Sequence, residues 1–271
     1  MADEPRPAWQ PFTFGGVAAF ATAPLRWLLF MELVVAIVAS VSIVWFVSLA
    51  YGPVVSRTIE QLPETAAIEA GYITGVDSPV VVETKFLSVQ LDTSEDPQFS
   101  ESSDVQIELR KGDGKTCSLL RSLLGCFEFG YPRDSTISLA RSHLEPWWGA
   151  RQPLIWALTF VGGIVYLFVS WAILAVVWAF VAKLVAWFAD RQLGWFGAWK
   201  ACSAALMPGA LLLALAVRLY HWQAIDLIAL SFFYAGHLVV GLVYVIGAPF
   251  KCPKVVLTKE AAPRPPKNPF A

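Results

Sequence analysis

The chain has 271 residues, of which 56% are hydrophobic and 15% charged, and its mean hydropathy is +0.57. These values lie outside the range of soluble globular domains, and a formal net charge of −1 argues against a nucleic-acid partner. Charge is unevenly distributed, because residues 52–152 hold 15 of the 21 acidic and 9 of the 20 basic residues. We therefore expect an acidic polar domain joined to a part that lies in a lipid bilayer.

The first apolar segment covers residues 25–51, LRWLLFMELVVAIVASVSIVWFVSLAY. A helix needs roughly 20 apolar residues to cross a bilayer core of about 30 Å. A cleaved signal peptide is the alternative, but this segment is about twice as long as a signal h-region and follows a weakly basic stretch. We predict an uncleaved signal anchor that forms the first transmembrane helix.

Three more apolar segments follow the polar domain. Residues 153–188 would extend about 54 Å as a helix, so we expect the helix to tilt or project, with Lys183 near its exit from the bilayer. The next two segments, 201–220 and 224–248, leave room only for a tight hairpin between them. The sequence thus predicts an α-helical membrane bundle of four helices, with a domain inserted between the first and the second.

Basic residues set the predicted orientation, because loops rich in Lys and Arg stay on the cytoplasmic side. The connection after the second span carries Lys183, Arg191 and Lys200 against Asp190 alone. The C-terminal tail is also basic. The predicted segments are a cytoplasmic N-terminal segment 1–24, helix 25–51, an extracytoplasmic domain 52–152, helix 153–182, a cytoplasmic connection 183–200, helices 201–220 and 224–248, and a cytoplasmic Pro-rich tail 249–271.

The inserted domain reads as a small β-rich or α+β domain. Residues 53–70 predict a helix broken at Pro63, and the β-branched runs after Gly71 predict strands. DVQIELRKGDGKTC alternates and then turns at Gly112 and Gly114, which indicates a hairpin.

Two cysteines bracket the stretch CSLLRSLLGC in this domain. In an oxidising compartment Cys117 and Cys126 would pair, whereas Cys202 and Cys252 would stay reduced on the cytoplasmic side. A complete helix from 117 to 126 would separate the two residues by about 13 Å, too far for a disulfide. Either the chain turns back and the bond forms, which we favour, or the segment is a helix with two free thiols.

The stretch LPETAAIEAGYITGVDSPVVVETKFLSVQLDTS after a first apolar helix, with three further helices behind it, resembles a family of uncharacterised bacterial polytopic membrane proteins. That resemblance implies an extracytoplasmic domain after the first helix and a bacterial inner membrane. It implies no activity, cofactor or site residue.

The common signatures of catalysis and metal binding do not occur: the chain contains no H-E-x-x-H, G-x-S-x-G, Walker A or C-x-x-C motif. We therefore expect no enzyme, no cofactor and no metal site. His237 lies near the middle of the fourth predicted span, where ionisable groups are often functional. It is either a proton relay or ligand contact, or a neutral imidazole that hydrogen-bonds a neighbouring helix, which we favour.

Glu32 is the second candidate within a span, either reaching the headgroups near Arg26 or acting as a buried coupling carboxylate. Small residues suited to close helix packing are Ala201, Ala205 and Gly209, at four-residue spacing, and, less regularly, Gly236 and Gly241.

Two functions fit these features. The first is a non-enzymatic accessory, assembly or scaffold subunit, which contacts a protein partner or further copies of itself through its outer domain and helix faces. The alternative is a component of a small-solute or proton-coupled transporter that uses His237 and Glu32.

Overall fold

The structure is a computed structural model that describes residues 10–95, 97, 103–118 and 126–255, the side chains of 115–118 excepted. The chain divides into two compact units. Unit 1 comprises Met1–Glu32, Ser170–Pro208 and Leu238–Ala271, and unit 2 comprises Leu33–Val169 and Gly209–His237. Each of the four long helices has one part in unit 1 and its other part in unit 2.

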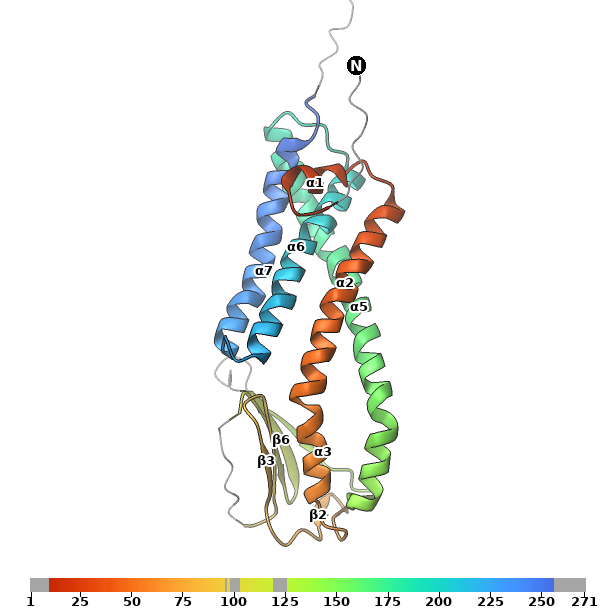
Figure 1. Cartoon of the computed structure of the whole chain (residues 1–271), viewed down its shortest axis with the longest axis vertical. Coiled ribbons are helices and arrows are strands. Elements are labelled where there is room, and N and C mark those ends of the chain that lie inside the picture. The colour runs from red at the N-terminus through yellow and green to blue at the C-terminus, as the bar shows by residue number, and fades with distance from the viewer. Residues whose placement is uncertain (1–9, 96, 98–102, 119–125, 256–271) are drawn as a thin grey trace, which may run out of the picture. The chain divides into compact units, whose positions relative to one another are not determined.

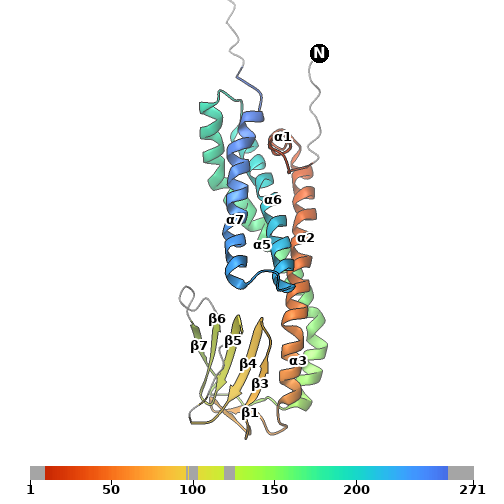
Figure 2. The same ribbon diagram turned by 60° about the vertical axis from the view of Figure 1, so that its left-hand side comes forward.

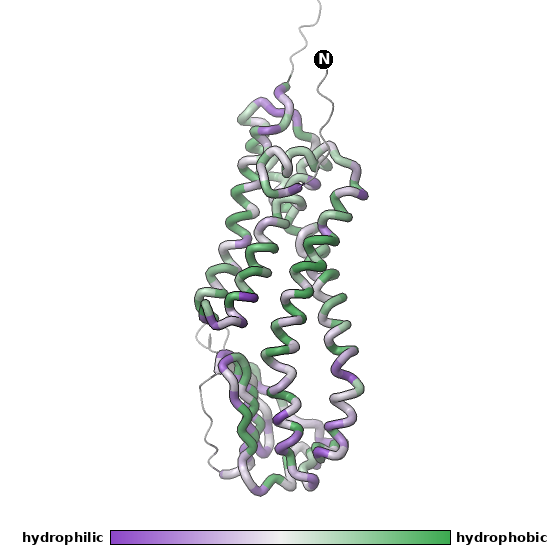
Figure 3. Tube along the Cα trace, in the orientation of Figure 1, coloured by the Kyte–Doolittle hydropathy of each residue, from purple (hydrophilic) through white to green (hydrophobic). Residues whose placement is uncertain are grey.

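Helices make up most of the described chain (Figure 1). Four helical stretches, Leu25–Gln61, Arg141–Phe188, Trp195–His221 and Leu227–Lys251, are long and apolar enough to cross a membrane. Their apolar character runs through most of each helix in Figure 3. The expectation of four apolar helices of membrane length is thus confirmed. The helical elements are α1 (Phe14–Ala19), α2 (Leu25–Ala50), α3 (Gly52–Gln61), α5 (Arg141–Phe188), α6 (Trp195–His221), α7 (Leu227–Gly247) and the 3₁₀ helix η1 (Ala248–Lys251).

Two of the helices, α5 and α6, are longer than the predicted spans. Helix α5 has 48 residues and includes Pro146 and Pro153, so it starts twelve residues before the predicted span 153–182 and continues six residues past it. The segment 183–200, expected as a connection, is helical except around residues 189–194. Hydropathy marks only the part of a helix that suits lipid, and polar helical turns at either end give no such signal.

The strands of unit 2 form two sheets (Figure 2). Five strands have the order β3-β4-β5-β6-β7, and a small sheet has the order β2-β1-β8. All described pairs are antiparallel except β4 with β5, which run parallel. The strands are β1 (Ala67–Glu69), β2 (Tyr72–Thr74), β3 (Val80–Glu83), β4 (Leu87–Asp92), β5 (Val105–Arg110), β6 (Asp113–Ser118), β7 (Cys126–Gly130) and β8 (Ile137–Ser138).

Alternation along the strands gives the larger sheet one apolar face. Because successive side chains point to opposite faces, Leu87, Val89 and Leu91 of β4 share one face of the strand. Val82, Leu87 and Val89 form a core with Val54 of α3, which contacts β3 and β4. The opposite face of β4 is polar yet buried, with Ser88, Gln90 and Asp92.

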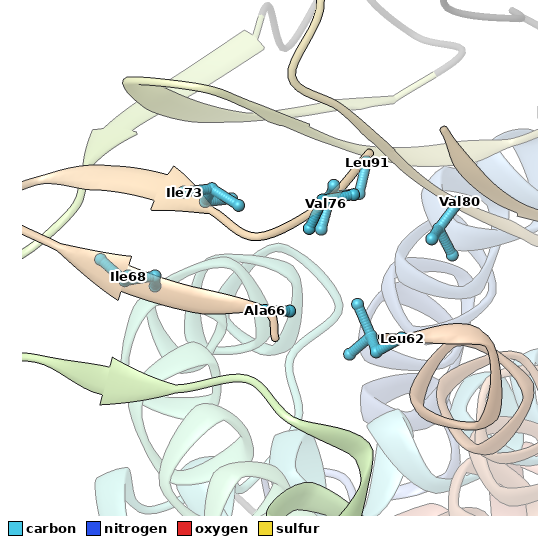
Figure 4. Packing of buried hydrophobic residues seen from close by; sticks show 7 residues of the cluster. All are labelled: Leu62, Ala66, Ile68, Ile73, Val76, Val80 and Leu91. Carbon is cyan, nitrogen blue, oxygen red and sulfur yellow. The ribbon is translucent and has the colours of Figure 1, made fainter. Parts of the chain in front are cut away.

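A second core connects the two sheets with the end of α3 (Figure 4). Buried residues from β1, β2, β3, β4 and the segments between them converge there: Leu62, Ala66, Ile68, Ile73, Val76, Val80 and Leu91. Helix α3 ends at Gln61, just before Leu62 and Pro63, because proline disfavours helical geometry in the residue that precedes it. This matches the break predicted at Pro63, but the helix expected beyond it, up to residue 70, is wrong, because Ala67–Glu69 form strand β1 and pair with β2 and β8.

The first turns of α5 pack on α3 within unit 2. The indole Nε1 of Trp148 donates a hydrogen bond of 3.1 Å to Ser56 Oγ. A Cβ at Gly52 would lie 3.5 Å from the ring of Trp156. The backbone N–H of Ser142 donates to the Glu64 carboxylate at 3.3 Å. The polar ends of two apolar helices therefore belong to the same packed domain as the sheets.

Unit 1 is helical and contains a short β-bridge. Arg191, which follows α5, pairs antiparallel with Lys254, which follows η1. The N–H of Gln192 donates to the Pro253 carbonyl at 2.8 Å, and the guanidinium of Arg191 donates to the Cys252 carbonyl at 2.8 Å. The chain after the fourth apolar helix is thereby fixed to the corner between α5 and α6.

Candidate functional site

Glu32 is buried in unit 1, with 3% of its surface exposed. Its carboxylate accepts a hydrogen bond from the hydroxyl of Ser203 on α6. In contrast to Glu32, the large apolar side chains of Phe30 and Leu33 near it on α2 are exposed. Helix α2 therefore directs one carboxylate inward among apolar neighbours that face outward.

Lys200 lies one helical turn before Ser203 and is also buried, with 7% of its surface exposed. Its ammonium donates a hydrogen bond of 2.6 Å to the Ala23 carbonyl, at the end of the chain preceding α2. It also lies 5.2 Å from the ring centroid of Phe196. Two polar contacts thus join the start of α6 to the start of α2. Of this group the sequence singled out only Glu32 as a candidate functional residue, and it placed Lys200 among the basic residues of the predicted connection.

His237 lies in unit 2, in the part of α7 that faces α6. Its Nδ1 hydrogen-bonds the carbonyl of Tyr234 in its own helix, which differs from the expected bond to a neighbouring helix. Its imidazole lies 5.1 Å from the Tyr234 ring, centroid to centroid. Glu32 belongs to unit 1 and His237 to unit 2.

The small residues predicted to allow close helix packing differ in how near other atoms lie to them, and one of them has no close neighbour. A Cβ at Gly209 would lie 2.3 Å from the carbonyl oxygen of His237, so the backbones of α6 and α7 approach closely there. A Cβ at Gly241 would lie 2.8 Å from the Trp178 ring, whereas one at Gly236 would meet no atom within 4 Å. Ala201 and Ala205 are buried on α6.

A cluster of rings in unit 2 joins the domain of sheets to the ends of two apolar helices. We call it the aromatic junction, and it consists of Trp45, Phe46, Tyr51, Phe86, Tyr220 and His221. Phe46 lies 5.4 Å from both Phe86 and Tyr220, measured between ring centroids. Phe86 lies 5.1 Å from Tyr220 and stacks on His221 at 5.9 Å. Such ring pairs stabilise beyond the area that they bury.

Charged groups surround the aromatic junction. The hydroxyl of Tyr220 donates a hydrogen bond to the carboxylate of Asp104, the residue before β5. Lys85 places its ammonium 6.0 Å from the centre of the Tyr220 ring, and Arg218 places its guanidinium 4.1 Å from that of Trp45. The Nδ1 atom of His221 is buried without a hydrogen-bond partner among the described residues.

Most of the junction is absent from the sequence-based candidates. The hydrogen bond between Asp104 and Tyr220 joins residues 116 positions apart, so no local pattern announces it. The available signal was a run of aromatic residues at the predicted ends of spans, which sequence reasoning assigns to the lipid interface.

The cysteines fall into two groups. Cys126 is disulfide-bonded, and β6 and β7 place Cys117 directly opposite it in register. Both residues lie on strands, so a helix through 117–126 is wrong, while residues 119–125 are outside the described part of the chain. Pairing of Cys117 with Cys126 stays a prediction.

Cys202 and Cys252 are free, buried thiols of unit 1 that line a small apolar pocket together with Ala182 and Val245. Burial raises the pKa of the Cys252 thiol, and the nearby Arg191 opposes that shift only in part. Cys252 therefore remains a thiol at neutral pH. In the described residues no group of three or more His, Cys, Asp or Glu side chains could hold a metal ion.

Comparisons of the chain with protein-family models, with curated proteins and with solved structures give no match.

Proposed function

We propose that the chain is an integral protein of a bacterial cytoplasmic membrane, with four spans, both termini in the cytoplasm and residues 52–152 outside. Support comes from the four apolar helices and from the basic residues Lys183, Arg191 and Lys200 near the α5–α6 corner. The basic tail begins beside the same corner, because Lys254 forms a β-bridge with Arg191 there. A disulfide at Cys126 suits an oxidising compartment on the other side.

Within that membrane we propose a non-enzymatic role as an accessory, assembly or scaffold subunit. The aromatic junction is the observation that carries this proposal, because it fixes the outer domain to α6 through buried rings and the bond from Tyr220 to Asp104. A domain held in this way can present a preformed surface to a protein partner, which lowers the entropic cost of association.

The orientation can be tested with two single-cysteine variants. Ser94 follows β4 and Gln192 lies at the α5–α6 corner, and both are exposed. We expect a membrane-impermeant maleimide added to intact cells to label Ser94→Cys and to leave Gln192→Cys unlabelled until the membrane is permeabilised. Cys202 and Cys252 are replaced by serine in both variants, so that any signal reports the new thiol. The reverse labelling pattern would refute the proposed orientation.

The accessory role is tested by purification in a mild detergent, followed by mass spectrometry of the proteins that accompany the chain. We expect a stoichiometric partner with the wild-type chain and less of it with Phe86→Ala, which opens the aromatic junction. Phe232→Ala is the matched control, because Phe232 is an exposed ring on α7. A chain that purifies as a homo-oligomer alone, from its native host, would contradict a role as subunit of a larger complex.

A component of a proton-coupled transporter is the second candidate, favoured by the buried carboxylate of Glu32. Solute flux into proteoliposomes should then fall in Glu32→Gln or in His237→Ala. An unchanged flux in both variants would remove this candidate.

A further inference from the structure

The carboxylate of Glu32 has few groups that could stabilise its charge. Ser203 supplies one hydrogen bond, and no ion pair to Glu32 is present among the described residues. Burying an ionised carboxylate costs several kcal/mol unless charged partners and several hydrogen bonds compensate for the lost water. A carboxyl group in this setting is more stable with its proton bound.

Apart from Glu32 itself, the charged side chains that α2, α5 and α6 carry within unit 1 are cations, which favour the ionised form. Lys200 on α6 lies one helical turn before Ser203, but its ammonium is bonded to the Ala23 carbonyl. Arg26 is exposed at the start of α2, and Lys183 of α5 donates to the Leu193 carbonyl at 2.6 Å. Helix α1 and residues 238–247 of α7 carry no charged side chain. Because none of these cations pairs with the carboxylate, desolvation outweighs their attraction.

We infer that Glu32 is a proton-binding site, in which the buried carboxyl group holds its proton at neutral pH. Glu32 lies seven residues into α2, about 10 Å along the helix from its first residue, Leu25. The bond from Lys200 to the Ala23 carbonyl lies at that same end of α2. The site exists whether or not the chain transports a solute, so it goes beyond the accessory role.

An apolar carbodiimide provides a direct probe, because it reacts with a protonated carboxyl group. The proton of the acid moves to one carbodiimide nitrogen while the carboxyl oxygen bonds to the central carbon, whose C=N bond becomes single. The O-acylisourea so formed rearranges to a stable N-acylurea by transfer of the acyl group to nitrogen. Nothing leaves, so Glu32 gains the mass of one whole reagent molecule.

The experiment treats the full chain in detergent with dicyclohexylcarbodiimide at neutral pH and locates the adduct by peptide mass spectrometry. We expect Glu32 to be labelled ahead of the exposed Glu64 and Glu69, and labelling to fall about tenfold per pH unit once the carboxyl group ionises. Infrared spectra should show a protonated carboxyl band at neutral pH that is lost in Glu32→Gln.

Two further variants test the surroundings. Ser203→Ala and Lys200→Met each remove a group that favours the anion, so labelling should persist to higher pH in both. Ser231→Ala is the matched control, since the hydroxyl of Ser231 is bonded to the Leu227 carbonyl on α7. Absence of both the adduct and the carboxyl band at neutral pH would overturn the inference. A positive result with unchanged flux in both Glu32→Gln and His237→Ala would reject transport and leave the proton site standing.

Discussion

At the scale of single residues, the contact between Tyr220 and Asp104 joins an apolar helix to the sheet domain. Both residues are buried, and the hydroxyl is the only polar group that phenylalanine would lack. Loss of a buried hydrogen bond to a charged group costs about 1–3 kcal/mol. We expect Tyr220→Phe to destabilise unit 2 by this amount, seen as faster hydrogen exchange at residues 84–87 and 103–106. Tyr234→Phe, at an exposed ring on α7, should leave exchange there unchanged.

Tyr131 gives unit 2 a defined response to alkaline pH. Its hydroxyl donates to the carbonyls of Asp113, at 2.7 Å, and Arg110, at 3.1 Å. Burial, and then the charge of Asp113, raise the pKa of Tyr131 to about 12. Because the folded value lies above the ordinary 10.0, the neutral phenol stabilises the fold fully below pH 10, and this contribution is lost as pH rises towards 12.

We therefore expect unfolding followed by circular dichroism to show falling stability between pH 10 and 12 in the wild-type chain. Tyr131→Phe should be less stable at neutral pH and show a flatter decline in that interval. A decline equally steep in the variant would assign it to other groups.

Single residues show where sequence reasoning succeeds and fails. Glu32 and His237 stand out because ionisable groups are rare in apolar helices, which is a property of the local sequence. Their partners are not local: Ser203 lies 171 residues from Glu32, and Asp104 lies 116 residues from Tyr220. Hydropathy thus identifies the unusual residue, whereas only the fold identifies the group that it contacts.

At the scale of elements, Gly209 and Gly236 offer a matched pair on facing helices. A Cβ at Gly209 would lie 2.3 Å from the His237 carbonyl oxygen, so α6 and α7 would have to separate. We expect Gly209→Ala to cost about 1–3 kcal/mol through overpacking. Gly236→Ala meets open space and should be neutral or stabilising. Thermal unfolding in detergent measures both, and equal effects would show that the close approach at Gly209 is unimportant.

The β6–β7 pair depends on the disulfide at Cys126. If Cys117 is its partner, the bond closes a loop of about ten residues and stabilises by roughly 2–3 kcal/mol. We expect alkylation under denaturing, non-reducing conditions to label only Cys202 and Cys252, and peptide mapping to join 117 to 126. Four labelled cysteines would show that no disulfide forms.

Helices and strands could be predicted from the sequence where a periodic pattern of apolar residues or a long apolar run defines them. β-branched runs indicate β3 and β4, which contact α3, and alternation of apolar and polar residues indicates β5. The parallel pairing of β4 with β5 was not predictable, since the short-range pattern of strands and turns favours antiparallel hairpins. The early start of α5 was hidden by Pro146 and Pro153, which the packing of α5 on α3 accommodates within a helix.

At the scale of the whole molecule, the length of the helices limits how much of each could lie in lipid under the proposed membrane arrangement. Helix α5 has 48 residues and would be about 72 Å long, while a bilayer core of about 30 Å needs roughly 20 residues. In the proposed four-span arrangement more than half of α5 would therefore lie outside the hydrocarbon. Its first turns carry polar residues and pack on α3, whereas its later part carries the large exposed apolar side chains Val176, Val177 and Phe180.

Two positions on α5 can show whether lipid or water surrounds each part of the helix, because no other part of the protein covers either of them. Val177 is 58% exposed, and Gly149 is exposed at a point where an added Cβ would meet no atom within 4 Å. In native membranes we expect a water-soluble maleimide to label Gly149→Cys readily and Val177→Cys hardly at all, since lipid covers the latter and suppresses formation of the thiolate. Denaturation in detergent should then label both equally. Equal labelling in the intact membrane would mean that water, and not lipid, surrounds the apolar surface of α5, and the proposed four-span arrangement would fail with it.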